Sequence, residues 1–270
     1  MEEPRPPVGL DTSKAHVARV YDYWLGGKDN FEADRAYGDA LEARVPSIRL
    51  TCRMNRQFLG RAVSFLTADA GIRQFLDIGT GLPTADNTHQ VAQRIAPAAR
   101  VVYTDNDPLV LVHARALLTS SPEGRTAYID ADVRDPGAIL EAKELTETLD
   151  LTEPVAVMLI AVLHLVTDDA VAYPAISTIF DAMPSGSYLV ISHATGDFWP
   201  QEQVDAANAT NQAHNVDFRF RTRSEVARFL TGLDLVDPGI VPVAEWRAGP
   251  DSVVPPSAES NIWAAVAKKP

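Results

Sequence analysis

Apolar side chains in the first part of the chain recur at helical spacing. The pattern i, i+3, i+4 and i+7 predicts a first helix over residues 12–25, which Gly26 ends. A second helix is predicted over residues 30–44, and a third over the regular apolar positions between residues 54 and 66. Because the pattern then changes, we expect residues 1–70 to form a helical cap on a different architecture.

From residue 74 the chain shows short apolar runs of the kind that form buried strands. These runs occupy residues 74–78, 101–104, 127–129, 155–160 and 188–192. Stretches with helical spacing alternate with them, at residues 88–95, 108–118, 138–145 and 168–183. Strands that alternate with helices predict a parallel sheet covered on both faces.

The end of the chain lacks this alternation. Residues 236–243 and 262–266 indicate two strands with no helix between them, so we expect them to pair antiparallel. A polar segment (195–220) and a short helix (224–230) precede these strands. The pattern predicts one α/β domain with a mostly parallel, seven-stranded sheet, divided into a helical cap (1–70), a core (71–193), and an insertion, last helix and antiparallel hairpin (194–270).

Composition narrows the environment and the partners. Although 46% of the 270 residues are hydrophobic, no apolar run approaches the roughly 18 residues that cross a bilayer, and the start is acidic and proline-rich. We therefore expect a cytoplasmic protein with no membrane partner. The single cysteine, Cys52, excludes an internal disulfide and a multi-cysteine metal site. A net charge of −12 disfavours a nucleic-acid partner, because the protein would repel the phosphate backbone. The candidate basic patch, Arg219, Arg221 and Arg223, is modest. Nothing in the sequence indicates an oligomeric state.

The stretch after the first predicted strand places an acid and two glycines, Asp77, Gly79 and Gly81, at the strand's end. Glycines suit this place because a sharp turn from strand to helix needs residues without Cβ constraints, and a ligand can approach their backbone closely. A dinucleotide fingerprint would have a third glycine where Thr84 stands, and the preceding Pro83 lacks an N–H. The departure weakens an NAD site and favours a nucleoside ligand without pyrophosphate.

A second acid follows the second predicted strand. Asp105 lies 24 residues beyond Gly81. This spacing is close to the roughly 20 residues expected before an acid that binds a ribose. A carboxylate there can accept hydrogen bonds from both ribose hydroxyls.

Three segments together resemble a bacterial family assigned as S-adenosylmethionine-dependent methyltransferases of class I, long catalogued as a domain of unknown function. They are the N-terminal block 18–31, residues 55–59, and the Asp-x-Gly-x-Gly motif at residues 77–81, and similarity extends to Trp246. The resemblance implies a Rossmann-like fold and S-adenosylmethionine as the cofactor. It identifies no acceptor, because one fold hosts many unrelated reactions.

The resemblance also implies roles for individual residues. The motif loop would lie against the amino-acid portion of the cofactor, and Asp105 would bind its ribose. Asn106, the Asp132 carboxylate and the Val133 backbone would meet the adenine. The residues expected to bind the cofactor are Asp77, Gly79, Thr80, Gly81, Asp105, Asn106, Asp132, Val133 and Ala161.

The segment after the fourth predicted strand contains His164, the candidate general base. A buried histidine that only packs is the alternative. The segment lacks the Asn-Pro-Pro-Tyr type of motif that amino-methylating nucleic-acid enzymes carry, which favours a small-molecule acceptor. The residues expected around that acceptor are Tyr21, Asn30, Arg53, His193 and Trp199.

Two other functions are compatible with the sequence. One is an NAD(P)-dependent oxidoreductase on the same doubly wound sheet. Two features disfavour it: Thr84 replaces the third glycine of the dinucleotide fingerprint, and the chain ends in an antiparallel hairpin. The other is a non-catalytic protein that keeps an S-adenosylmethionine pocket for sensing or partner binding.

Overall fold

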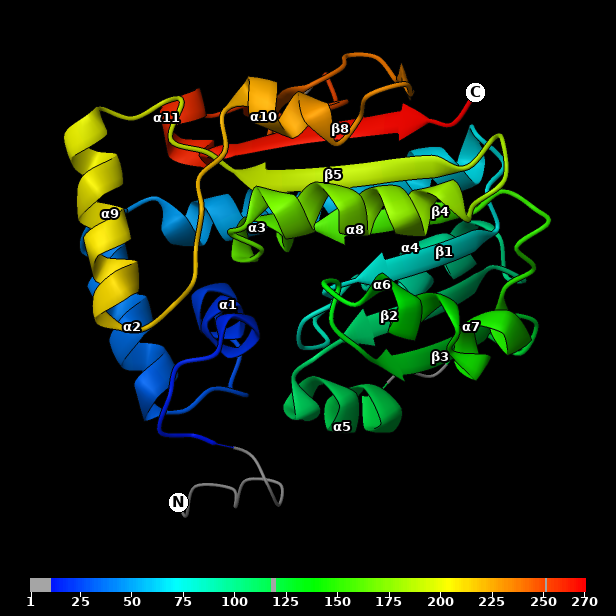
Figure 1. The fold of residues 1–270 in the computed structure, drawn as a ribbon, viewed down its shortest axis with the longest axis horizontal. Coiled ribbons are helices and arrows are strands. Elements are labelled where there is room, and N and C mark those ends of the chain that lie inside the picture. The colour runs from blue at the N-terminus through cyan, green and yellow to red at the C-terminus, as the bar shows by residue number, and fades with distance from the viewer. Residues whose placement is uncertain (1–10, 118–119, 251) are drawn as a thin grey trace.

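The computed structural model describes residues 11–117, 120–250 and 252–270 (Figure 1). Its centre is a sheet with the strand order β3-β2-β1-β4-β5-β8-β6, to which β7 is added by pairing with β8. The strands are β1 (Gln74–Ile78), β2 (Arg100–Asp105), β3 (Arg125–Asp130), β4 (Ala156–Ile160), β5 (Tyr188–Ala194), β6 (Asp234–Leu235), β7 (Val241–Pro242) and β8 (Ile262–Lys268). The helices are α1 (Val17–Leu25), α2 (Glu32–Glu42), α3 (Ile48–Ala68), α4 (Thr88–Ile95), α5 (Pro108–Leu117), α6 (Pro136–Leu140), α7 (Lys143–Thr148), η1 (Leu163–Leu165), α8 (Asp169–Asp181), α9 (Gln201–Ala213), α10 (Arg223–Arg228) and α11 (Ser257–Ser260).

The predicted parallel core is confirmed. Strand β1 pairs with both β2 and β4, and the sheet continues outward to β3 and β5 with every one of these pairs parallel. The order of the strands therefore reverses between β1 and β4, and open α/β sheets bind ligands beyond the carboxyl ends of the strands at such a point. Figure 1 shows these ends pointing toward the side where α1, α2 and α9 lie.

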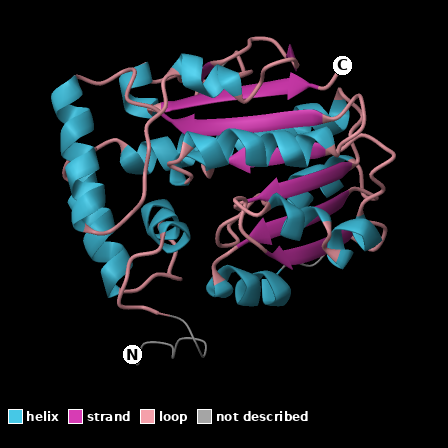
Figure 2. Ribbon diagram, viewed as in Figure 1, coloured by secondary structure: helices cyan, strands magenta, loops and turns pink. Residues whose placement is uncertain are grey.

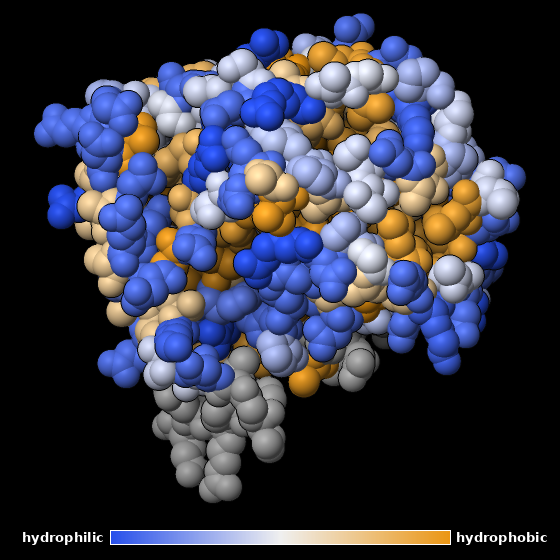
Figure 3. All heavy atoms as spheres, in the orientation of Figure 1, coloured by the Kyte–Doolittle hydropathy of each residue, from blue (hydrophilic) through white to orange (hydrophobic). Residues whose placement is uncertain are grey.

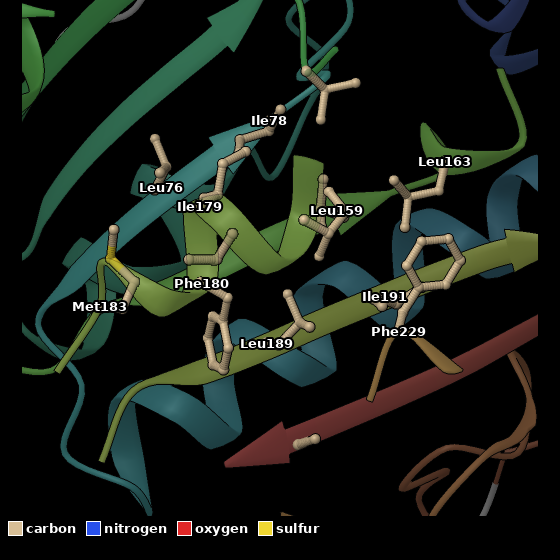
Figure 4. Close-up of a cluster of buried hydrophobic side chains, with 14 of the residues drawn as sticks. Leu76, Ile78, Leu159, Leu163, Ile179, Phe180, Met183, Leu189, Ile191 and Phe229 are labelled. Atoms are coloured by element: carbon tan, nitrogen blue, oxygen red, sulfur yellow. The ribbon is translucent and has the colours of Figure 1, made fainter. Parts of the chain in front are cut away.

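Alternate residues of the strands pack into two hydrophobic clusters, one on each face of the sheet. Leu76 and Ile78 of β1 join the cluster under α8, whereas Phe75 joins the cluster under α3 and α4. Figure 2 shows the helices on both faces, and Figure 4 shows side chains of the first cluster packed between β1, β4, β5 and α8. Burial on both faces explains why these strands are continuous apolar runs in the sequence.

The three predicted cap helices are confirmed as α1, α2 and α3. Gly26 ends α1 in the left-handed conformation, with φ of +85°. A further helix, α9, forms inside the segment that the sequence indicated as a polar insertion. Only Ala207 and Asn211 of α9 are buried, so its apolar pattern is too sparse to be recognised. Helix α9 lies beside α2 and completes the cap (Figure 1).

Two predicted elements are wrong in detail. Residues 138–145 form parts of two helices, because Ala142 is extended (φ −61°, ψ 129°) between α6 and α7. Residues 236–243 are not a continuous strand. A turn, closed by the Gly239 N–H donating to the Val236 carbonyl at 2.8 Å, separates β6 from β7, and Pro238 inside it has no N–H for a ladder. Both short strands still pair antiparallel with β8, as predicted.

The face seen in Figure 3 is mostly hydrophilic, with small hydrophobic areas between polar side chains. Among the described residues, no helix combines the length and apolar character needed to span a bilayer.

Candidate active site

A cavity of about 410 Å³ lies between the carboxyl ends of the parallel strands and the cap. This volume is within the range of roughly 300–1,000 Å³ typical of small-molecule sites. Loops after β1, β2, β3 and β4 line one end, which we call the strand end. Side chains of α1, α2, α3 and α9, together with residues 215–218 and Phe220, line the other, which we call the cap end.

The loop after β1 has the open backbone that its glycines predict. Gly79 and Gly81 are both left-handed, with φ of +72° and +67°. A Cβ on Gly79 would lie 2.5 Å from a Val162 methyl carbon, so this glycine permits close packing against the loop after β4. A Cβ on Gly81 would meet open space, which leaves its backbone accessible from the cavity.

Two buried carboxylates organise the strand end. Asp105 accepts hydrogen bonds from the backbone N–H groups of Gly81 (2.8 Å) and Asp107 (2.9 Å), and burial raises its pKa. Asp77 accepts from the Thr88 hydroxyl at 2.6 Å, and burial raises its pKa to about 6. Both side chains are held in fixed positions at the cavity wall.

The loop after β3 presents a third carboxylate. Asp132 accepts from Arg134 Nε at 2.8 Å and from Asn106 Nδ2 at 2.7 Å. The hydrogen bond from Arg134 is the main cause that lowers the pKa of Asp132 to about 2. The carboxylate is therefore ionised, and Val133 beside it is buried in the cavity wall.

Ala161 adopts the left-handed conformation at the end of β4, with φ of +57°. This conformation costs a residue with a side chain roughly 1–2 kcal/mol. The Ala161 N–H is held by Ser192 of β5, through the carbonyl at 3.1 Å and the hydroxyl at 2.9 Å. A strained backbone that neighbouring strands hold in place is a frequent feature of functional sites.

His164 lines the cavity from η1 and is 8% exposed. Its ring packs on Phe218, with the centroids 4.6 Å apart. Burial, and then the nearby His193 and Arg221, lower the pKa of His164 well below its usual value. The ring is therefore neutral near pH 7, and its Nδ1 accepts from the Ala194 N–H at 3.4 Å, which places the ring proton on Nε2.

At the cap end, Tyr21 joins α1 to α3. Its hydroxyl donates to the Cys52 carbonyl and accepts from Asn55 Nδ2, both at 3.0 Å. Cys52 is a buried free thiol whose pKa burial raises, so it forms part of the wall as a neutral group. Trp199 closes another side, and its Nε1 donates to the Ala258 carbonyl at 3.1 Å.

A family model described as S-adenosyl methyltransferase matches residues 3–270. The chain belongs to this family. It is therefore an S-adenosylmethionine-dependent methyltransferase, which decides against the oxidoreductase alternative, while the match leaves the acceptor unidentified.

Solved structures agree with the family. A DUF574 family protein from Streptomyces avermitilis is 47% identical with a TM-score of 0.92, and the match covers 96% of this chain and 99% of that one. A proposed methyltransferase from Thermobifida fusca is 41% identical with a TM-score of 0.88, covering 98% of each chain. An O-methyltransferase family 2 protein from Planctomyces limnophilus, in complex with apigenin, shares only the fold (16% identity, TM-score 0.50, 88% of this chain and 67% of that one). No curated protein matches the chain in sequence.

The strand end of this methyltransferase fits an adenosyl cofactor. The open space over Gly81 allows a ligand to approach the bare backbone. An ionised carboxylate has about four acceptor positions, and Asp105 uses two of them for backbone N–H groups. The others can accept from ribose hydroxyls. Every residue expected to bind the cofactor lines this one cavity: Asp77, Gly79, Thr80, Gly81, Asp105, Asn106, Asp132, Val133 and Ala161.

The residues expected around the acceptor are only partly brought together. Tyr21 and Trp199 line the cavity, but Asn30, Arg53 and His193 do not. Asn30 is turned toward its own segment, where its Nδ2 donates to an Asp22 oxygen at 2.9 Å. Arg53 lies on the exposed face of α3.

His193 is excluded from the cavity because it is fully buried in a polar network. Its Nδ1 lies 2.8 Å from the Ala194 carbonyl, and its Nε2 lies 3.0 Å from Arg221 Nη1. Arg221, fully buried as well, donates to the Leu163 and Val166 carbonyls at 2.8 Å each. The network supports the backbone that carries the cavity wall.

The cavity lining also contains residues that the sequence analysis did not predict, among them Arg56 and Asn211. Arg56, three positions beyond Arg53, lines the cavity and donates to the carbonyls of Ala85 and Asp86 at 3.0 Å each. Arg56 lies in the 55–59 block that carries the family resemblance, and this block was the feature of the sequence that could have indicated it as a site residue. Asn211 of α9 also lines the cavity, and it had no signal because α9 itself was not predicted.

Proposed function

We propose that this methyltransferase transfers the methyl group to a small molecule bound at the cap end of the cavity, and that the whole chain acts as one domain in the cytoplasm. The observation that carries the proposal is that one cavity contains both the strand end and the cap end. This cavity is lined by the strand-end residues expected to hold the cofactor and by aromatic side chains of the cap, among them Trp24, Tyr37 and Trp199. A donor and an acceptor bound at these two ends would share one enclosed space.

We assign each strand-end group a role from its position. Asp105 would accept from the ribose hydroxyls, and Asp132 with the backbone of Val133 would bind the adenine edge. The backbone from Gly79 to Gly81 would lie against the amino-acid portion. Arg56 places a positive charge beside this loop, close enough to lower the pKa of Asp77 against the effect of burial. This guanidinium would pair with the carboxylate of the cofactor.

When bound there, S-adenosylmethionine supplies a sulfonium-activated methyl group: the acceptor's lone pair forms the bond to the methyl carbon, and the electron pair of the broken carbon–sulfur bond stays on sulfur. The protein contributes alignment and exclusion of water. A neutral amine acceptor can lose its proton to water afterwards, whereas a hydroxyl must lose it during transfer. His164 is neutral, but its Nδ1 lone pair accepts from the Ala194 N–H and its Nε2 carries the ring proton. We therefore propose that it orients the acceptor as a hydrogen-bond donor and does not take that proton.

The charge distribution supports a small molecule over a nucleic acid. Two of the three arginines in the candidate basic patch are paired with acidic neighbours. Arg221 is fully buried against Asp169 at 2.9 Å, and Arg219 pairs with Asp169 at 3.0 Å and with Glu225 at 2.9 Å. Arg223 donates to a backbone carbonyl. These arginines offer little free positive charge to a phosphate backbone.

A labelling experiment tests the proposal. The purified protein is incubated with S-adenosylmethionine labelled in its methyl group and with a bacterial extract separated into small-molecule, protein and nucleic-acid fractions. We expect the label in the small-molecule fraction. Label confined to the protein or nucleic-acid fraction would overturn the proposed acceptor class.

A variant ties the transfer to the cavity. Asp105→Ala should weaken S-adenosylmethionine binding about 10-fold to 150-fold, because it removes a charged acceptor worth roughly 1.5–3 kcal/mol, and labelling should fall with it. Asp234→Ala, at an exposed acid of β6, is the matched control and should bind like the wild type. Equal binding by Asp105→Ala would contradict the ribose assignment.

A further inference from the structure

Three asparagine side chains that line the cavity each carry a polar atom with no hydrogen-bond partner among the described residues. The atoms are Asn55 Oδ1, Asn211 Nδ2 and Asn261 Oδ1. The three side chains are 1%, 3% and 4% exposed. A buried polar atom without a partner costs about 1–3 kcal/mol, so a bound ligand that supplied the partner would gain from all three.

Neighbouring hydroxyl groups determine which atom of each amide stays unpartnered. The Tyr21 hydroxyl donates to the Cys52 carbonyl, so it must accept from the Asn55 amide nitrogen, which leaves the Asn55 oxygen free. The Tyr37 hydroxyl donates to Asn211 Oδ1 at 2.8 Å, which leaves the Asn211 amide nitrogen free. Asn261 Nδ2 donates to the Ser47 hydroxyl at 3.4 Å, which leaves the Asn261 oxygen free. The cavity therefore offers a ligand acceptors at Asn55 and Asn261 and a donor at Asn211.

The walls between these amides are aromatic and uncharged. Trp24, Tyr37, Trp199, Phe218 and Phe220 contribute rings to the lining. Flat rings pack most favourably against other rings, stacked or edge to face, which favours a planar occupant.

The charges of the lining lie elsewhere. Asp77, Asp105, Asp132 and Arg134 belong to the strands and loops of the strand end, and Asp217 is exposed. Arg56 of α3 is directed to the same end, where it donates to the Ala85 and Asp86 carbonyls after the β1 loop. A charged ligand at the cap end would lose its hydration without an opposite charge to pair with, which is costly.

We propose that the cap end is an acceptor subsite for a small, uncharged, planar aromatic molecule that carries both a hydrogen-bond donor and a hydrogen-bond acceptor. The donor meets Asn55 or Asn261, and the acceptor meets Asn211. The inference deepens the proposed function and rests on it, since the subsite serves as the methyl-acceptor site only if the strand end holds the cofactor. The shared cavity of about 410 Å³ keeps the occupant to one small ring system.

Calorimetric titration with three matched probes tests the subsite in the presence of saturating S-adenosylhomocysteine. The probes are 2-naphthol, which is aromatic and neutral, 2-naphthoate, which is aromatic and charged, and decahydro-2-naphthol, which is neutral but not flat. We expect 2-naphthol to bind at least about tenfold more tightly than either of the others. Equal or tighter binding of 2-naphthoate or of decahydro-2-naphthol would overturn the proposal.

Variants assign the binding to the amides. Asn55→Leu and Asn211→Leu should each weaken 2-naphthol about threefold to tenfold, the value of one hydrogen bond. Gln212→Leu, on the exposed side of α9 next to Asn211, should bind the probe like the wild type. Wild-type affinity in both asparagine variants would overturn the assignment.

S-adenosylhomocysteine titration of the same proteins separates the two hypotheses. Variants that keep its affinity have kept the fold and the strand end, so a loss of 2-naphthol binding then belongs to the cap end. A wild-type protein that fails to bind S-adenosylhomocysteine contradicts the proposed roles of the strand-end residues. A wild type that binds it but does not distinguish the probes contradicts the subsite alone.

Discussion

Gly79 and Gly81 share a left-handed backbone but serve different purposes. A side chain on Gly79 would collide with Val162, so that glycine is needed for packing between the loops after β1 and β4. A side chain on Gly81 would collide with nothing and would instead occupy the space above the loop. At the scale of a residue, the same conformational freedom therefore permits close packing at one position and leaves open space in the cavity at the other.

Replacing Gly81 tests this distinction against a matched glycine. Gly232 is also left-handed (φ +81°) with open space at its Cβ, but it lies outside the cavity lining. Gly81→Ala and Gly232→Ala should each lower the free energy of unfolding by about 1–2 kcal/mol from backbone strain. Only Gly81→Ala should also weaken S-adenosylhomocysteine binding in calorimetric titration. Similar ligand affinity in both variants would show that the space above Gly81 is not used.

His193 illustrates how a neighbour determines a protonation state. A guanidinium can only donate and a carbonyl oxygen can only accept, so its contacts with Arg221 and Ala194 are both satisfied only by the neutral ring with its proton on Nδ1. Burial is the largest cause that lowers the pKa of His193, to about 3.

Acid should therefore destabilise the protein through this residue. An unfolded histidine binds a proton below about pH 6.5, whereas folded His193 stays neutral down to about pH 3, so stability falls as the pH drops through that window. His193→Gln keeps an acceptor for Arg221 and cannot titrate. In urea unfolding between pH 6 and pH 4, the free energy of unfolding of His193→Gln should fall less steeply than that of the wild type, by about 1 kcal/mol per pH unit. His214→Gln, at a half-buried position, is the control, and an unchanged slope in His193→Gln would contradict the assigned neutral ring.

At the scale of elements, α9 belongs to the cap although the insertion that contains it follows the core in the sequence. Tyr37 of α2 and Asn211 of α9 are both buried, and the hydrogen bond between them joins segments 174 positions apart. The aromatic ring of His214, at the end of α9, lies 5.3 Å from that of Tyr37. These contacts place α9 where its residues can reach the cavity.

Removing this hydrogen bond should loosen the cap. Tyr37→Phe leaves the Asn211 amide without its partner, at a cost of about 1–3 kcal/mol. Hydrogen exchange should quicken in α2 and α9 while β1, β4 and β5 keep their protection. Tyr23→Phe removes a hydrogen bond to Asp39 at the surface and should change stability by less than about 0.5 kcal/mol. Unchanged exchange in α9 would mean that other contacts hold it.

At the scale of the whole molecule, the cavity is assembled from segments that begin at residue 15 and end at residue 262. A ligand that touches both ends should connect the cap to the sheet. Binding to the folded state alone raises its stability in proportion to the logarithm of ligand concentration.

Ligand-induced protection measures that connection. S-adenosylhomocysteine at about 100 times its dissociation constant should raise the free energy of unfolding by about 2.7 kcal/mol. Hydrogen exchange should slow in the loops after β1 and β2 and also in α1 and α3. Asp105→Ala at the same concentration should show a smaller gain. Protection restricted to the strand loops would indicate that the cap does not take part in cofactor binding.

The sequence by itself determined the parallel core and the cofactor end. Buried parallel strands must be apolar on both faces, and their carboxyl ends must meet at one edge, so local patterns were enough to predict Asp77, Gly81 and Asp105 around one site. Asp132 was added to them by the family resemblance alone. The glycine loop and the acid after β2 have a local physical reason that depends little on the rest of the chain. The terminal antiparallel pairing followed from the missing crossover helix.

Only the tertiary structure decided the cap end. The polar residues of α9 give no periodic signal, and their place beside α2 depends on contacts between distant segments. On α3, the local pattern could not show that Arg56 lies at the cavity while Arg53 is exposed. Histidines are common in active sites, but the Nε2 of His193 already accepts a hydrogen bond from Arg221, which lies 28 positions away in the sequence. Local patterns report which residues are buried or turned, whereas long-range packing decides which polar groups are left free for a ligand.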